Sequence, residues 1–137
     1  MANLTITANE VALVKEFETL TVPAGATITA GQICRIEIST GKAIPAYATT
    51  TGNLGNVLGV ALRSVETGKS VTLVKRGIVD LGTAPLSGVA IESPIYVSDT
   101  SGTLADSAGT VSKVVGRVIA GWANTSFDKL LYIDMNL

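Results

Sequence analysis

Short stretches rich in Val, Ile and Thr alternate along this chain with turns that contain glycine. The turns recur about every 8–12 residues, a spacing typical of sandwiches and barrels built from many short strands. In residues 13–22, charged or hydroxyl side chains alternate with apolar ones, as they do in a half-exposed strand. The pattern predicts an all-β fold, a small antiparallel β-barrel or sandwich-like domain with little room for helix.

The same pattern places the individual strands and turns. Glycine turns separate most of the expected strands, and the polar stretch 49–56 is expected to be an exposed loop. Segment 83–94 is compatible with either a strand or a short helical turn. The expected strands cover residues 13–22, two short pieces of 26–38 around Ala30-Gly31, then 43–48, 57–64, 71–75, 78–81 and 95–98, and two stretches that flank 124–126. The expected turns are 66–68, Arg76-Gly77 and 99–102.

Two segments of the chain are weakly similar to each other. Residues 59–62 followed by 69–74 correspond to residues 116–119 followed by 129–134. In both, a glycine opens the first strand and a lysine starts the second, so each predicts a hairpin. Shared hairpin geometry and a duplicated unit both explain this similarity.

Length and hydrophobic content define the domain organisation. With 137 residues, of which 47% are hydrophobic, the chain is long enough for one domain with its own core. We expect this β domain to cover residues 13–137. Residues 1–12 have no glycine or proline turn toward the next strand, and Leu4 and Ile6 alternate with threonines. They are therefore predicted to be either a frayed terminus or an extended N-terminal arm that adds a strand to another chain, and the alternation favours the arm.

The charge distribution argues against nucleic acid and membrane as partners. The chain has ten Lys and Arg and eleven Asp and Glu, which gives a net charge of -1, and the cations are scattered along the sequence. Phosphate binding requires clustered cations. No apolar run approaches the roughly 18 residues that span a bilayer, and the N-terminus has neither a cationic start nor a continuous hydrophobic block. We expect no export signal and no membrane anchor.

The residues available for catalysis are few. The chain has no His, and its single Cys34 is expected to be a buried apolar residue on one strand face with Ile36 and Ile38. No motif of a nucleotide-binding loop or a nucleophile elbow occurs. Asp99 and Asp106 could offer oxygens to Ca²⁺, but a hairpin turn explains this segment better. We therefore expect a protein that is not an enzyme and needs no cofactor or metal.

Candidate contact residues come from the sparse aromatic side chains, the arm and the polar loop. For self-association the candidates are Leu4, Ile6, Tyr96, Trp122 and Phe127. For Trp122 a core position is favoured over an interface, and an interface over a ligand platform. For contact with a larger partner the candidates are Leu4, Ile6, Thr51, Asn53, Leu54 and Asn56.

Six strand-and-turn motifs follow one another in a familiar order. They are GATITAGQI (25–33), TGKA (40–43), VLGVA (57–61), GKSVTLV (68–74) with RG (76–77), PIYVS (94–98) with GTL (102–104), and VGRV (115–118). This ordered set resembles the capsid cement, or head decoration, proteins of tailed bacteriophages, from about residue 25 to residue 133. Residues before Gly25 lie outside the resemblance.

The resemblance implies a structural protein of the virion. Such proteins are made in the host cytoplasm, assemble as homotrimers and bind the outer surface of the expanded head, where they reinforce contacts between major capsid protein subunits. The family has no catalytic residues that could be transferred to this chain. Two alternatives stay open, a receptor- or glycan-binding β module of a phage tail or fibre, and a small β-barrel enzyme or metal-binding module.

Overall fold

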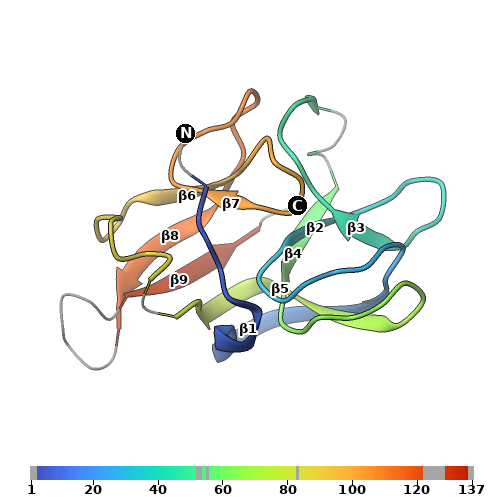
Figure 1. Cartoon of the computed structure of the whole chain (residues 1–137), viewed down its shortest axis with the longest axis horizontal. Helices are drawn as coiled ribbons and strands as arrows, with labels where there is room; N and C mark the ends of the chain where they lie inside the picture. The colour runs from blue at the N-terminus through green and yellow to red at the C-terminus, as the bar shows by residue number, and fades with distance from the viewer. Residues whose placement is uncertain (1–2, 52–53, 55, 83, 122–128, 136–137) are drawn as a thin grey trace.

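The computed structural model describes residues 3–51, 54, 56–82, 84–121 and 129–135. These residues form one antiparallel sheet that curls into a half-barrel, which confirms the predicted all-β class (Figure 1). Its path through the described residues is β3-β2-β4-β5-β9-β8-β6-β7, and β1 pairs with β5 beside this path. The strands are β1 (Ala12–Pro23), β2 (Ile33–Ile36), β3 (Ala43–Pro45), β4 (Val57–Ala61), β5 (Ser70–Asp80), β6 (Pro94–Val97), β7 (Leu104–Ala105), β8 (Val114–Ala120) and β9 (Lys129–Asp134), and a short 3-10 helix covers Ala8–Glu10.

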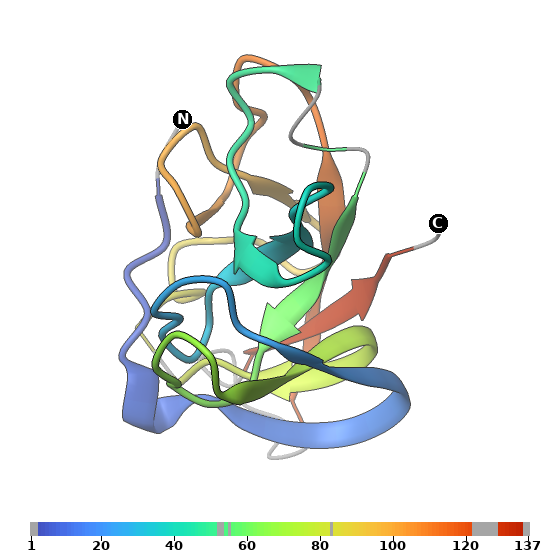
Figure 2. The same cartoon turned by 90° about the vertical axis from the view of Figure 1, so that its right-hand side faces the viewer.

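Strand β5 joins the two halves of the sheet. Along one edge it pairs first with β4, through Leu73 and Val74, and then with β9, through residues 76–79. Along its other edge it pairs with β1 over its whole length. Figures 1 and 2 show β1 and β5 curving together beneath the other strands. The half-barrel thus has β2, β3 and β4 on one side of β5 and β6, β8 and β9 on the other.

The prediction of two strands separated by a turn at Arg76-Gly77 is wrong. β5 is continuous through this point, and Gly77 serves close packing between strands and not a turn. A Cβ atom at Gly77 would lie 2.6 Å from the carbonyl oxygen of Lys15, where β1 has an irregular register against β5. Glycine at this position lets the two backbones approach each other.

Two groups of buried residues form the core. In β2, β4 and β5, neighbouring residues point to different groups, as Val60 and Ala61 do, since successive side chains of a strand face opposite ways. This half of the sheet is therefore buried on both faces. In β8 and β9, Val118, Leu131 and Ile133 belong to the larger core group. Arg117 and Asp134 are exposed on the opposite face of these strands.

Other local predictions are confirmed or corrected in the described residues. The turn before Leu104 forms as expected, with Gly102 at a φ of 71°. Cys34 is buried and shares the smaller core group with Ile36, but Ile38 is 81% exposed because β2 ends at Ile36. Within the loop expected to be exposed, Leu54 is buried in the larger core group. The described part of segment 83–94 forms turns before β6 starts, neither strand nor helix.

The N-terminal residues pack on their own domain. Asn3 forms a β-bridge with Ala105, and the Leu4 amide donates to the carbonyl oxygen of Leu104 at 2.8 Å. Leu4 is part of the larger core group, and Ile6 packs against it. Asn3 and Leu4 lie along β7 of their own chain, and Ala8–Glu10 form a 3-10 helix instead of continuing an extended arm. No helix among the described residues has the length and apolar character to cross a bilayer.

Candidate functional site

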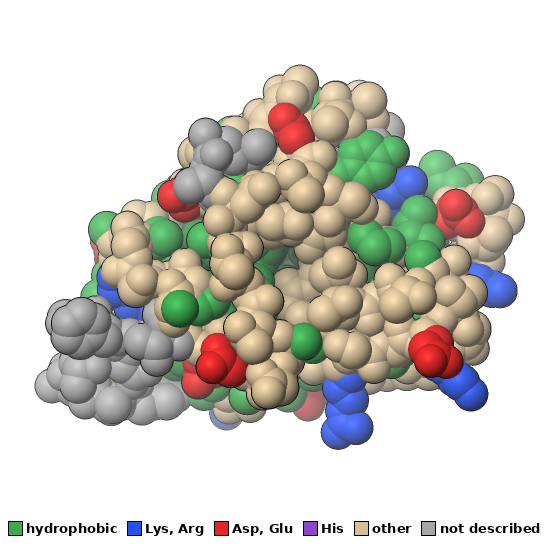
Figure 3. Space-filling view, in the orientation of Figure 1, with side chains coloured by type: hydrophobic (Ala, Val, Ile, Leu, Met, Phe, Trp, Pro, Cys, Tyr) green, Lys and Arg blue, Asp and Glu red, His purple; other side chains and the backbone are tan. Residues whose placement is uncertain are grey.

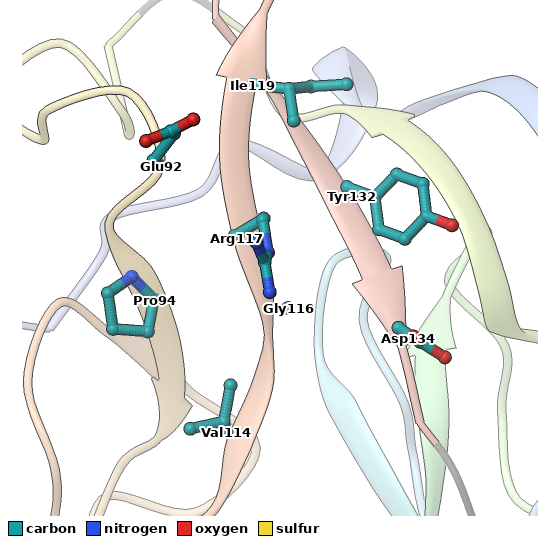
Figure 4. A pocket seen from close by; sticks show the side chains of 8 residues that line it. All are labelled: Glu92, Pro94, Val114, Gly116, Arg117, Ile119, Tyr132 and Asp134. Carbon is teal, nitrogen blue, oxygen red and sulfur yellow. The ribbon is translucent and has the colours of Figure 1, made fainter.

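A groove of about 640 Å³ opens on the face of β8 and β9 that the core leaves uncovered (Figure 4). We call it the outer groove. It lies over the half of the sheet that is buried on one face only, so its existence follows from the way the core is divided. Its lining residues are Glu92, Pro94, Val114, Gly116, Arg117, Ile119, Tyr132 and Asp134.

Strand register brings the central residues of the groove into one row. Tyr132 of β9 lies opposite Arg117 of β8, and Arg117 lies opposite Pro94 of β6. Ile78 of β5 extends the row on the other side of Tyr132. Figure 4 shows Arg117 between Pro94 and Tyr132. A cation thus lies in the middle of a row whose other members are apolar or aromatic.

The charges of the groove differ in how they are paired. Asp134 forms an ion pair with Arg76, with 3.4 Å between Oδ1 of Asp134 and Nε of Arg76. Both side chains are nearly half exposed. Within the described part of the chain, neither Arg117 nor Glu92 has a salt bridge. These two exposed charges are therefore available to a partner.

Glu92 has an unusual backbone conformation. Its φ is 74°, and it is the only residue besides glycines with positive φ in the part of the chain that the structure describes. Its amide donates to the carbonyl oxygen of Val118 at 2.7 Å, which anchors this conformation to β8. Such backbone strain is concentrated at functional sites in proteins. The hydrogen bond to Val118 holds the strained Glu92 backbone at the rim of the groove.

Aromatic contact extends the apolar surface beyond the groove. The rings of Phe17 in β1 and Tyr132 in β9 lie 6.1 Å apart between centroids, with an angle of 45° between their planes. Phe17 is 50% exposed, and Val114 on the other side of the groove is 48% exposed. The contact between Phe17 and Tyr132 thus adds apolar surface next to the groove.

A second, smaller hollow lies where the N-terminal segment meets the domain. Its volume is about 200 Å³, and Leu4 and Ile6 form part of its wall. Below it, the buried Ser98 hydroxyl donates to the side-chain oxygen of Asn3, and the Asn3 side-chain amide donates to the Thr100 hydroxyl. These polar contacts fix the segment to the turn between β6 and β7.

The structure places the predicted contact residues at separate locations. Leu4 and Ile6 lie together against the core, so either can contact a partner chain through its buried surface only if the segment detaches. Tyr96 is half-buried in β6, opposite Ala105, which also bridges to Asn3. The remaining candidates are scattered or cannot be placed. Thr51 is exposed, Leu54 buried and Asn56 half-buried, whereas Asn53, Trp122 and Phe127 lie outside the described residues.

The groups weighed for chemistry are held in structural roles. Cys34 is fully buried, and burial raises the pKa of its thiol to about 12, which keeps it protonated. Both carboxylate oxygens of Asp99 accept hydrogen bonds from Thr110, one from its amide and one from its hydroxyl, each at 2.8 Å. Among the described residues, no three acidic, Cys or His side chains gather as a metal site would require.

Sequence reasoning did not single out Arg117, Glu92 or the groove as a site. A signal for Arg117 is present, since a lone cation interrupts the apolar strand VVGRVIA. On the face drawn in Figure 3, acidic and basic side chains are dispersed and form no single patch. The groove depends on strand neighbours far apart in sequence, so no local pattern identifies it.

Comparison with known proteins adds no family assignment. The chain matches no model of a known protein family, and no curated protein matches it significantly.

Proposed function

We propose that this chain is a structural cement protein of a tailed phage head, which binds the outer surface of the expanded capsid and reinforces contacts between major capsid protein subunits. The observation that carries the proposal is the ordered set of six motifs that resembles this family. These motifs fall on successive strands and turns of one sheet, including β4, β5, β6 and β8. Their glycines at residues 41, 68 and 102 have positive φ in turns, as expected if the motifs encode the fold.

The groove supports a binding role. A cement protein needs contact surfaces with apolar area and specific charges, and the outer groove offers both around Arg117. Each contact can be modest, because a protein that joins several subunits gains avidity of roughly 10²–10⁴ from effective concentration. We propose no catalytic role, since the thiol of Cys34 is buried and protonated.

Co-sedimentation tests the proposal directly. The purified protein is mixed with expanded, undecorated capsids and with unexpanded procapsids of its source phage, and bound copies per capsid subunit are measured. We expect saturable binding to the expanded shell at a fixed stoichiometry. Absence of binding to either shell would overturn the proposal.

A second candidate function is glycan or receptor binding in a phage tail or fibre. It is favoured by the partly exposed ring of Tyr132 in an open groove beside Arg117 and Glu92, because sugars stack on aromatic rings and bond to charged side chains. Screening against a glycan array with the wild type and Tyr132→Ala separates the two functions. Ring-dependent glycan binding without capsid binding would replace the first proposal by this one.

A further inference from the structure

The loop between β4 and β5 displays a second set of exposed charges. Arg63, Glu66 and Lys69 are spaced three residues apart and all are exposed. In the described part of the chain, none of the three has a salt bridge. At Gly68 a Cβ atom would meet nothing within 4 Å, so the tip of the loop projects from the surface.

Backbone hydrogen bonds hold this loop in one shape. The Val65 amide donates to Ile28 and the Gly68 amide donates to Ala24, each at 2.8 Å, while the Lys69 amide donates to Glu66 at 3.1 Å. A loop that is already ordered loses little conformational entropy when it binds. It is therefore suited to enter a groove as a preformed element.

The charges of the loop and of the groove are complementary in order. The loop carries Arg63, Glu66 and Lys69, that is positive, negative, positive. The groove carries Glu92 and Arg117, neither of which has a salt bridge within the described residues, and on the other side of Arg117 it carries Asp134, which is paired with Arg76 (Figure 4). We propose that the outer groove receives the β4–β5 loop of a second copy of this chain, with the Glu66 carboxylate bound by the Arg117 guanidinium.

The two surfaces cannot meet within one chain. The loop precedes Ser70, at the start of β5, whereas the groove lies over β8 and β9, and β9 pairs with residues 76–79 in the second half of β5. Figure 1 shows β8 and β9 left of the centre, whereas the light-green loop before β5 lies at the lower right. A contact between unlike surfaces of two copies is heterologous, and repeated with the right rotation it closes a ring. This inference goes beyond the proposed function and does not require capsid binding.

A charge exchange tests the contact. The mass of the wild type, Arg117→Glu, Glu66→Arg and the double variant is measured in solution by size-exclusion chromatography with light scattering over a concentration series. We expect an oligomeric wild type, and dissociation constants about tenfold or more higher for both single variants, because like charges then face each other. The double variant, in which the pair is reversed, should regain most of the lost affinity.

Lys42→Glu is the matched control for Arg117→Glu, since Lys42 is exposed between β2 and β3 and the change in net charge is the same. It should leave the oligomer unchanged, and circular dichroism checks that all variants are folded. The contact is overturned if the wild type is a 14.0 kDa monomer at millimolar concentration, if the single variants associate like the wild type, or if the double variant is not rescued. Capsid binding is measured separately on the wild type, so loss of one proposal does not imply loss of the other.

Discussion

Gly116 in β8 lies so close to the carbonyl oxygen of Tyr132 in β9 that a Cβ atom has no room between them. Gly59 in β4 has the same relationship to the carbonyl oxygen of Val74 in β5. These are the glycines that open the two similar segments of the sequence, and both segments form antiparallel strand pairs. Both glycines thus serve close backbone approach between paired strands.

Replacing Gly116 by alanine should destabilise the domain. The added methyl group would overlap the Tyr132 carbonyl, and relief requires β8 and β9 to separate, so we expect a loss of about 2 kcal/mol or more in the free energy of unfolding. Urea denaturation measures it. Gly88→Ala is the control, since a Cβ atom there meets nothing within 4 Å, and its effect should be small. Equal stability of the two variants would contradict the close approach.

Leu4→Ala should lower stability although the residue lies near the chain start. Leu4 is 8% exposed within the larger core group. Truncating a core leucine to alanine typically lowers the free energy of unfolding by about 2–5 kcal/mol. We expect a loss near the lower end, because the segment is held at an edge of the sheet. Thermal unfolding of Leu4→Ala is compared with Thr5→Ala, whose side chain is exposed. If both variants unfold like the wild type, the segment does not contribute to the core in solution.

Cys34 should make stability depend on alkaline pH. Burial raises the pKa of the folded thiol from 9.0 to about 12, so the unfolded chain releases this proton first. The thiol's contribution to stability is therefore complete below pH 9 and is lost as the pH rises from 9 toward 12, by at most about 1.4 kcal/mol per pH unit. Other groups also titrate in this range, so the test is the difference between the wild type and Cys34→Ala in urea denaturation. Parallel pH profiles for the two proteins would show that the thiol is not buried.

The ring pair of Phe17 and Tyr132 should couple β1 to β9 across β5. Aromatic pairs at such distances contribute about 0.5–1.5 kcal/mol beyond the area they bury. A double-mutant cycle with Phe17→Leu and Tyr132→Leu, followed by urea denaturation, measures this coupling energy. Strictly additive losses would mean that the rings do not interact in solution.

Local patterns were sufficient to predict most of the individual strands. The alternation of residues 13–22 corresponds to β1, and the glycine turn after β6 formed where expected. Side-chain alternation and positive φ are properties of a few neighbouring residues, so sequence carries them directly. The same local reasoning misjudged Gly77, because a glycine that allows two strands to approach looks in sequence like a glycine in a turn.

The class of the fold and the burial of Cys34 were accessible from the sequence by itself, since both depend on residue types and their order. The outer groove was decided only by the tertiary structure. Pro94, Arg117 and Tyr132 come from three strands and share one row because the strands pair in the order β6, β8, β9. Which face of those strands stays uncovered depends on how β5 divides the core between the two halves of the sheet. Strand order and core division arise from contacts between residues distant in sequence, and no local pattern encodes them.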